Sequence, residues 1–405
     1  MNTATTKTVT IHGLAAGGDA VGRDDDGRVV FVRRGAPGDR ANVTLTREKK
    51  GFAFGEIESL ETQSPVRVEP RCSVFNDSNC GGCQWQHINR KHQLSAKHKI
   101  VQDALRKLTD KVEAPSPKTP EFRWRRKVRL HWTRERKQGR ADIGFFASQS
   151  HKVIPFTTCV QLSQPLEVVV KDVASELAPS LTKTGEIEIV VGQEGFAHVA
   201  IHGPCKISAA KELLSHSKIV GVKLGKRLFG ESTVALPEGG RAGGQHFVQA
   251  SAEGNQALRV LVDKATEQRV GDSVLELYAG GGNLTQTLCV GAKQVVAIDT
   301  NIAKPCAPNV QTIRGDVGGA VEELLSQMKR FDWIVLDPPR VGAKGILEKL
   351  VAFQPKGIIY VSCNPATLAR DCESVAEKYR LETVTVLDMM PQTCHVEVIA
   401  SLQPV

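Results

Sequence analysis

The stretch Gly357–Asp371, GIIYVSCNPATLARD, contains a strand, a sharp break and the start of a helix. Residues 358–361 form a short apolar run rich in β-branched side chains, which predicts a buried β-strand. Ser-Cys-Asn-Pro ends this run, and a helical segment follows from about Ala366. Cys363 is therefore expected at the C-terminal end of a strand, the edge at which ligands bind in an open α/β sheet. A thiol at this edge can act as a nucleophile, although most free cysteines are small buried hydrophobic residues.

Earlier apolar runs extend this pattern to a Rossmann-like α/β domain. Each run is followed by residues that can contact a ligand: the glycine-rich turn Ala279–Asn283, Asp299, Asp316 and Asp337. The turn lets the backbone approach a nucleotide closely, Asp299 is placed to accept hydrogen bonds from a ribose, and Asp316 to read an adenine amino group. No phosphate-loop lysine accompanies the turn. The pattern fits an S-adenosylmethionine methyltransferase better than a dehydrogenase or an ATPase.

Composition places this domain in a larger basic protein. The 405 residues carry a formal net charge of +9, and 41% of them are hydrophobic. The charge favours a polyanionic partner, and the length and apolar content predict two or three domains with real cores. No apolar run is long enough for a membrane span, and the first residues do not resemble a signal peptide. We expect a cytoplasmic protein without a membrane or an obligate protein partner.

The N-terminal residues Val9–Glu61 show a different pattern, in which runs of Val, Thr and Phe alternate with glycine-containing turns. This alternation predicts a small antiparallel β-barrel. Six basic side chains would lie on its exposed faces: Arg33, Arg34, Arg40, Arg47, Lys49 and Lys50. A generic small β-domain with a basic rim is the alternative, and composition does not separate the two.

Four of the ten cysteines form one constellation. Cys80 and Cys83 are the ends of a C-x-x-C with two glycines between them, Cys72 lies just upstream, and Cys159 is the candidate for a fourth ligand. Four thiolates suit either zinc or an iron–sulfur cluster, and the spacing does not choose between them. In a reducing compartment a disulfide framework is not expected. The other six cysteines are scattered, and most of them are expected to be packing residues.

Residues 90–108 predict an amphipathic helix with one apolar stripe, and its lysine and arginine side chains, Lys97 among them, are expected on the polar side. A proline-rich link at 114–120 follows. The segment Phe122–Arg140 is the strongest basic stretch, with nine Lys or Arg and one acid from Arg123 onward. Such a segment can neutralise phosphates while its aromatic rings stack on unpaired bases. The candidate RNA contacts are Arg123, Arg125, Arg126, Lys127 and Trp132; the alternative is a strand with one charged face and its tryptophans in the core.

Several motifs together resemble one family, the bacterial RNA uracil-5-methyltransferases of the TRAM-containing, iron–sulfur type that modify 23S ribosomal RNA. The motifs cover nearly the whole chain: VVFVRRGAPGDRANV with its GGDAVGR turn, CGGCQWQH, FVQ, LELYAGGGN, DPPR, SCNPATLARD and QTCHVE. The resemblance implies S-adenosylmethionine as methyl donor and a 4Fe-4S cluster. It also implies an RNA substrate, with ribosomal RNA favoured over transfer RNA.

The resemblance also assigns roles residue by residue. Cys363 would be the nucleophile and Glu397 the general base. The S-adenosylmethionine contacts would be Gln249, Tyr278, Asn283, Asp299, Asp316 and Asp337. The cluster ligands would be Cys72, Cys80, Cys83 and Cys159. The implied domains are a TRAM RNA-binding barrel at 1–62, a central iron–sulfur and RNA-binding region at 63–240, and a Rossmann-like methyltransferase domain at 241–405 on which helix 90–108 packs.

Three positions depart from the family pattern. Seven residues separate Cys72 from Cys80 where five are usual, and Asp299 stands where glutamate is usual. Only sixteen residues separate Asp299 from Asp316, too few for the helix that the family inserts, so a more open cofactor pocket is expected there. Two other functions were weighed against the favoured one: a cytosine-5 methyltransferase with the same thiol chemistry, and a non-catalytic RNA-binding or redox-responsive protein.

Overall fold

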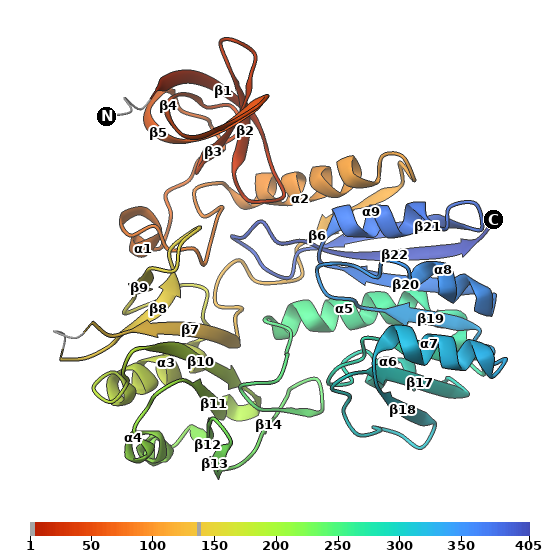
Figure 1. Cartoon of the computed structure of the whole chain (residues 1–405). Helices are drawn as coiled ribbons and strands as arrows, with labels where there is room; N and C mark the ends of the chain where they lie inside the picture. Colours follow the sequence, from red (N-terminus) through yellow and green to blue (C-terminus); the bar gives the residue numbers. More distant parts are fainter. Residues whose placement is uncertain (1–4, 136–138) are drawn as a thin grey trace.

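The computed structural model describes residues 5–135 and 139–405, which fold around three main β-sheets (Figure 1). Of the basic segment, Arg136 and Lys137 lie outside the described residues. The fold has the predicted α/β class with an N-terminal barrel. Within the described residues, no helix is long and apolar enough to cross a membrane.

The N-terminal sheet is a closed barrel in the order β1-β2-β3-β5-β4. Its strands are β1 (Thr6–Leu14), β2 (Ala20–Asp24), β3 (Val29–Arg33), β4 (Arg40–Lys49) and β5 (Phe52–Thr62). Alternate side chains of β1 and β4 point inward, as the period of a half-buried strand requires, and form a small apolar core. The strand pairs are antiparallel except β3 with β5, which is parallel. The expected barrel is confirmed, and it differs from a fully antiparallel barrel only in the parallel pair of β3 and β5.

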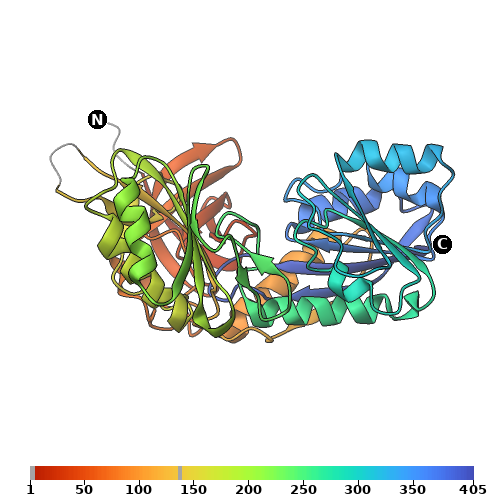
Figure 2. The ribbon, with the colours of Figure 1, turned by 90° about the horizontal axis from the view of Figure 1, so that it is seen from below.

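The central sheet contains seven strands of the described chain, ordered β13-β12-β11-β10-β7-β8-β9. Its strands are β7 (Lys127–Thr133), β8 (Asp142–Phe146), β9 (Val153–Pro155), β10 (Thr184–Val191), β11 (Ala197–His202), β12 (Ile219–Leu224) and β13 (Arg227–Gly230). Helices α3 (Gln164–Leu177) and α4 (Ile207–Glu212) pack their apolar sides on one face. Figure 2 shows these helices on the side turned away from the C-terminal sheet, which leaves the other face directed toward it.

The C-terminal sheet contains eight strands of the described chain, ordered β18-β17-β16-β19-β20-β22-β21-β6. Its strands are β6 (Val112–Ser116), β16 (Ser273–Leu277), β17 (Gln294–Asp299), β18 (Val310–Arg314), β19 (Trp333–Leu336), β20 (Gly357–Ser362), β21 (Tyr379–Leu387) and β22 (Glu397–Pro404). The strands from β18 to β20 are parallel, and β22 is antiparallel to β20. Their carboxyl ends therefore meet at one edge, as in other open α/β sheets.

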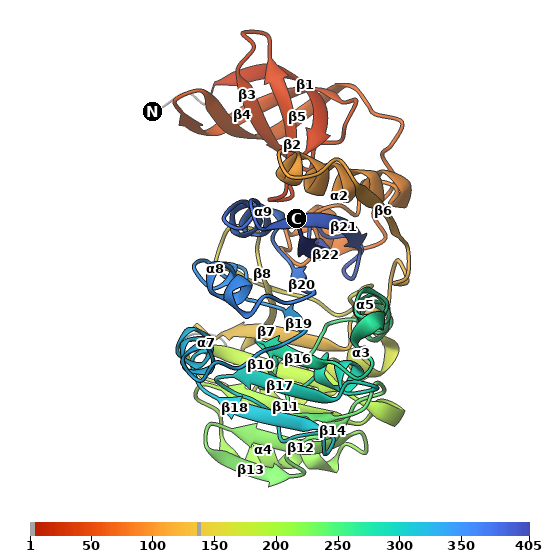
Figure 3. The same ribbon diagram turned by 90° about the vertical axis from the view of Figure 1, so that its right-hand side faces the viewer.

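Helices cover both faces of this sheet (Figure 3). One core contains residues of α2 (Arg90–Leu105), α7 (Val317–Ser326), α8 (Leu347–Leu350) and α9 (Pro365–Glu373). The other core contains residues of α5 (Ala252–Ala265) and α6 (Thr285–Leu288). The remaining elements are α1 (Ser73–Asp77), the small pair β14 (Val234–Ala235) and β15 (Arg241–Ala242), and the 3-10 turns at 193–195, 213–215, 267–269 and 351–353.

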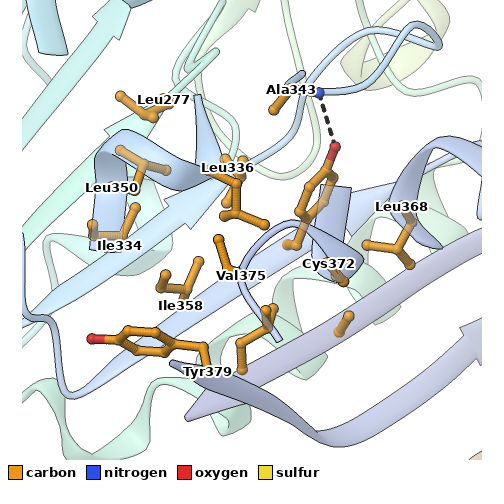
Figure 4. Close-up of a cluster of buried hydrophobic side chains, with 14 of the residues drawn as sticks. Leu277, Ile334, Leu336, Ala343, Leu350, Ile358, Leu368, Cys372, Val375 and Tyr379 are labelled. Carbon is orange, nitrogen blue, oxygen red and sulfur yellow. Dashed lines mark hydrogen bonds between the residues drawn. The ribbon is translucent and has the colours of Figure 1, made fainter. Parts of the chain in front are cut away.

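The first core fixes the loops that carry the candidate site (Figure 4). Tyr360 of β20 is fully buried, and its hydroxyl donates to Asp371 Oδ2 at 2.7 Å. The Ala343 N–H donates both to that hydroxyl, at 3.1 Å, and to Asp371 Oδ2, at 2.7 Å. Through these bonds the loop after β19 is tied to α9, which directly follows the stretch around Cys363.

Two local expectations were wrong. Part of the proline-rich link is the edge strand β6, which pairs in parallel with β21; prolines are tolerated on an edge strand because one side of it needs no ladder hydrogen bonds. Lys97 does not lie on a polar face of α2. It is 0% exposed, because its ammonium group pairs with the equally buried Asp388 at 2.6 Å.

Candidate active site

Three predicted residues meet at adjacent strand ends of the C-terminal sheet. β20 ends at Ser362, directly before Cys363, and Ser362 pairs with Val398 of β22, so Glu397 begins β22 beside the thiol. β19 ends directly before Asp337, and its last residue pairs with β20. Neighbouring strands lie about 4.8 Å apart, so the three side chains share one small region.

Burial and mutual repulsion shift the pKa values of this group. Burial raises the pKa of the Cys363 thiol, and the negative charge of Glu397 raises it further. Burial raises the pKa of Asp337 to about 7. Burial, with repulsion from Asp337, raises the pKa of Glu397 well above its ordinary value. Such paired shifts at strand ends are typical of groups that exchange protons during a reaction.

Arg340 is a functional candidate that the sequence reasoning did not assign, although DPPR was one of the recognised motifs. Its positive charge lowers the pKa values of Cys363 and Glu397 against the effect of burial. Its main-chain oxygen accepts from Asn364 Nδ2 at 3.0 Å, and its guanidinium lies 3.3 Å from His395 Nδ1. Arg340 is thus held between the loops that carry the three acidic groups.

The glycine-rich turn after β16 has room for a ligand. A Cβ atom built on Gly280 or Gly281 would meet nothing within 4 Å, and Gly280 and Gly282 have φ values of 51° and 81°. Tyr278 also has a positive φ, 61°, and the nearby charge of Asp316 contributes to raising its pKa, after burial. The turn therefore presents an open surface of backbone at the edge where the acids converge.

The predicted acidic contacts lie around this turn. Asp299 is the last residue of β17, and its Oδ1 accepts from the Asn301 N–H at 2.7 Å, which fixes the carboxylate at the strand end. Asp316 caps α7, because its Oδ2 accepts from the Gly319 N–H at 2.9 Å. No helix lies within the described residues 300–309, in agreement with the short spacing noted in the sequence.

The two predicted amide contacts, Asn283 and Gln249, have hydrogen-bond partners within the protein. Asn283 forms a reciprocal amide pair with Asn255, at 2.7 and 2.8 Å, which leaves one N–H and one lone pair for a ligand. The main-chain oxygen of Gln249 accepts from Arg126 Nε at 3.0 Å. Two residues earlier, the ring of Phe247 is 78% exposed, an aromatic surface that the sequence reasoning did not single out.

Glu276 is the second functional candidate that was missed. It lies in the buried strand β16 and is 2% exposed, and its Oε2 has no hydrogen-bond partner. Burial raises its pKa to about 8 against hydrogen bonds with Thr285, and the charges of Asp337 and Asp299 add to the rise. The signal in the sequence was an acid within an otherwise apolar strand. A buried carboxyl with one oxygen free of hydrogen bonds, in the strand that leads into an open glycine turn, fits a polar, cationic ligand such as S-adenosylmethionine.

The four predicted cluster cysteines act on one another electrostatically. A bridge to Ala147 holds Cys80 against the turn between β8 and β9. Burial raises the pKa of Cys80 to about 11 and that of Cys83 to about 12. The negative charge of Cys159 contributes to both rises, and that of Cys72 contributes to the rise at Cys80. Cys80 Sγ accepts from the Gly82 N–H at 3.5 Å, a bond that suits a bound thiolate.

The donor set therefore fits a thiolate-bound group, with one restriction. Within residues 5–135 and 139–405, no three His, Cys, Asp or Glu side chains stand close enough together to hold a metal ion.

Two of the predicted RNA contacts are engaged within the protein. Trp132 is 1% exposed, and its Nε1 donates to the Thr182 carbonyl at 3.2 Å, so its ring offers no face to a base. Arg126 is 5% exposed and forms a two-pronged ion pair with Glu238. For these two residues the alternative of a packed strand fits the structure, and the RNA-contact interpretation is corrected.

The other three differ in exposure. Arg123 is exposed but pairs with Glu167 at 2.5 Å. Arg125 is partly buried and lies over the ring of Trp124. The Lys127 ammonium donates to the main-chain oxygen of His246 and lies 3.9 Å from Glu188. Much of the basic charge in this segment is therefore balanced by protein partners.

Comparison with known proteins gives results along the whole chain. The family described as tRNA (Uracil-5-)-methyltransferase matches residues 322–404, and the TRAM domain matches residues 3–57. The chain is 32% identical to a 23S rRNA (uracil(1939)-C(5))-methyltransferase from Pectobacterium atrosepticum, over 97% of this chain and 92% of that protein. It is 32% identical to an uncharacterized RNA methyltransferase from Gloeobacter violaceus, over 98% and 96%.

Among solved structures, the fold is similar to that of the Pyrococcus abyssi tRNA (uracil-54, C5)-methyltransferase in complex with S-adenosyl-L-homocysteine. The TM-score is 0.73 at 21% sequence identity, and the similarity covers 98% of this chain and 99% of that one. At this identity the likeness concerns the fold. It extends to all three sheets, because nearly the whole chain is covered.

Proposed function

The chain belongs to the RNA (uracil-C5)-methyltransferase family, and on this premise we propose that it methylates C5 of a uridine in 23S ribosomal RNA with S-adenosylmethionine as methyl donor. The observation that carries the proposal is the meeting of Cys363, Glu397 and Asp337 beside the open glycine turn. A thiol alone at a strand end would be weak evidence. A thiol with a buried carboxyl next to it and a cofactor turn two strands away is a specific arrangement for this chemistry.

The thiol solves the main chemical difficulty, because C5 of uracil is too weak a nucleophile to take a methyl group unaided. The Cys363 thiolate adds to C6, forming a C–S bond and moving the ring electrons toward C5 and O4. C5 then attacks the sulfonium methyl group, and S-adenosylhomocysteine leaves with the electron pair of the broken S–CH3 bond. Arg340 favours the thiolate, since its charge lowers the pKa of Cys363 against burial.

Glu397 completes the reaction. Its carboxylate removes the proton from C5, the electrons of that C–H bond restore the C5–C6 double bond, and the C6–S bond breaks to release the Cys363 thiolate. Because burial raises the pKa of Glu397, its carboxylate is a stronger base than an exposed glutamate. Asp337 lies at the next strand end, where it can contact the pyrimidine or the cofactor.

We assign the cofactor contacts to Gln249, Tyr278, Asn283, Asp299 and Asp316, with Asp337 at the border to the base. Their support is position: Tyr278, Asn283, Asp299, Asp316 and Asp337 end or follow the strands β16 to β19 at their carboxyl ends. Gln249 precedes α5, and Asn255 of that helix is paired with Asn283. Single substitutions of Tyr278 and Asp299 should weaken S-adenosylmethionine binding in calorimetry. An unchanged dissociation constant would contradict the assignment.

Ribosomal RNA is favoured over transfer RNA because relatives named for 23S rRNA are 31–32% identical over 97% of this chain. The similarity to the tRNA enzyme, at 21% identity, is one of fold. Mapping 5-methyluridine in both RNAs from a strain that lacks this protein tests the choice. Loss from 23S rRNA alone supports it, loss from tRNA alone contradicts it, and 5-methylcytidine in the product would point instead to a cytosine-5 methyltransferase.

We further propose that Cys72, Cys80, Cys83 and Cys159 hold a 4Fe-4S cluster. The support is the burial of the thiols, their mutual electrostatic influence and the N–H donor to Cys80. Anaerobically purified protein should contain about four iron and four sulfide per chain, and Cys83→Ser should lose them. Stoichiometric zinc in place of iron would contradict the assignment.

The domain limits follow as part of the proposal: a barrel at 1–62, a central region at 63–240 and a catalytic domain at 241–405. Helix α2 lies within the central sequence, but Val101 and Leu105 belong to the core of the C-terminal sheet. We therefore count α2 structurally with the catalytic domain.

A further inference from the structure

The loop between β21 and β22 leads directly to Glu397, the proposed general base. It comprises residues 388–396 and contains no strand or helix, so contacts with other parts of the chain determine its path. Figure 1 shows it extending from the C-terminal sheet toward the segments around α1 and α2. Gln392, near its middle, is 1% exposed and has a φ of 68°. A glutamine rarely adopts this left-handed conformation unless its surroundings hold it there.

The main chain of Gln392 is bonded on both sides. Its oxygen accepts from the Gln84 N–H at 3.1 Å and from the Trp85 N–H at 3.0 Å, in the segment that follows the C-x-x-C. Its N–H donates to Gln93 Oε1 of helix α2 at 3.1 Å. Two segments that are distant in the sequence thus hold the loop at one residue.

The side chain of Gln392 completes the arrangement. Gln93 Nε2 donates to Gln392 Oε1 at 2.9 Å, and Gln392 Nε2 donates to Glu121 Oε1 at 2.9 Å. Gln93 is itself 0% exposed, and the same amide nitrogen donates to the carbonyls of Trp85 and Ile88. The contacts of Gln392 with Gln93 are therefore buried, the contact with Glu121 is partly buried, and together with the main-chain bonds they come from three parts of the chain. Such bonds fix a loop far better than exposed ones.

From Gln392 the chain has only four residues before Glu397. Thr393 Oγ1 donates to the Met390 carbonyl at 2.7 Å, and His395 N–H donates to Thr393 Oγ1 at 3.3 Å, so this short segment follows the position of the anchored peptide. A shift at Gln392 would be transmitted to the start of β22. Misplacement of a base by as little as about 1 Å can slow proton transfer substantially.

We propose that Gln392 is a positioning residue for the deprotonation step, holding the loop so that Glu397 faces the base bound to Cys363. This inference rests on the proposed function. The contact of the loop with α2 and the segment after the C-x-x-C would then serve one chemical step, the release of the enzyme from the methylated base. The residue touches neither substrate nor cofactor and acts through Glu397.

The test is a single-turnover reaction of the full protein with S-adenosylmethionine and 23S rRNA. The rRNA is taken from a strain that lacks this protein. Samples are stopped in SDS, and the covalent protein–RNA adduct and the released 5-methyluridine RNA are measured over time. Gln392→Gly keeps the left-handed backbone available and removes the side-chain bonds. We expect normal adduct formation but release slowed about tenfold, which equals about 1.4 kcal/mol in the barrier.

Gln354→Gly is the matched control. Gln354 has the same conformation, with a φ of 55°, but is exposed and lies before β20, away from the loop. It should release product at the wild-type rate. Glu121→Ala removes one bond to Gln392 from an exposed residue, so the variant should fold normally. It should slow release in the same direction by a smaller factor.

Release at the wild-type rate by Gln392→Gly overturns the inference, as does an equal slowing of adduct formation and release. If Gln392→Gly does not fold, wild-type release by Glu121→Ala overturns it. A wild-type protein that forms neither adduct nor 5-methyluridine overturns the proposed function itself, so the two failures are distinguishable.

Discussion

The buried ion pair between Lys97 and Asp388 offers a sharp test of how the catalytic domain is held together. Both side chains are 0% exposed, and the Nζ to Oδ1 distance is 2.6 Å. Lys97→Met keeps an apolar stem of similar shape and removes the ammonium group. Removing one partner of a buried pair typically costs about 3–5 kcal/mol, because the other charge remains buried.

Here the lower end of that range is expected. Asp388 keeps a second ion pair with Arg90 and a hydrogen bond from the Met390 N–H at 3.2 Å. We therefore expect Lys97→Met to lose about 3 kcal/mol of unfolding free energy, a fall of roughly 6–12 °C in thermal midpoint for a domain of this size. Scanning calorimetry at neutral pH measures the shift.

Lys99→Met on the same helix is the matched control. Lys99 is 70% exposed and pairs with Asp103 one turn later, so its loss should cost no more than about 0.5 kcal/mol. Adding Asp388→Asn to Lys97→Met should recover part of the loss, since the stranded negative charge is removed. Equal midpoints for Lys97→Met and Lys99→Met would refute the reasoning.

Three further outcomes follow from the described contacts. The pKa of Asp337 rises from 3.8 to about 7 on folding, so the native state holds this proton more tightly than the unfolded state and the stability of the wild type falls as pH rises through this range. Asp337→Asn should lack that fall. Its thermal midpoint should be higher than that of the wild type at about pH 8 but not at about pH 4. Arg340→Met should raise the pKa of Cys363, seen as an alkaline shift in the pH profile of its alkylation; an unchanged profile would count against the role of Arg340. Trp132→Ala should cost about 3–5 kcal/mol of stability, measured by urea unfolding, and a stable variant with weaker RNA binding would restore the stacking interpretation.

The sequence predicted the strand ends well because parallel strands carry a strong local signal. Buried strands of such a sheet are short apolar runs, and ligand residues follow them directly, so Asp299, Asp337 and Cys363 could be placed from neighbouring residues. The glycine turn was predictable for the same reason. Strand β6 was missed because a proline such as its Pro115 is tolerated only on an edge strand, and the sequence does not show which strand forms the edge.

Side-chain environments set by distant residues could not be predicted. Lys97 pairs with a residue 291 positions away, and Arg126 with one 112 positions away, so both were expected to be exposed charges. Trp132 donates to Thr182, 50 positions away, and a basic strand with aromatic residues has the same pattern whether its rings are buried or exposed. The pairing of β22 with β20, which brings Glu397 to Cys363, is likewise a property of topology.

The central claim is that Cys363 forms a covalent bond to C6 of a uracil and that a proton must then leave C5. RNA in which 5-fluorouridine replaces uridine tests this directly, because a C5–F bond cannot release a proton and the reaction stops after methyl transfer. The wild-type protein with labelled S-adenosylmethionine should give an SDS-stable protein–RNA complex that carries the methyl label, and Cys363→Ala should give none. A labelled complex of equal yield with Cys363→Ala, or none with the wild type while 5-methyluridine still forms in normal RNA, would contradict the account.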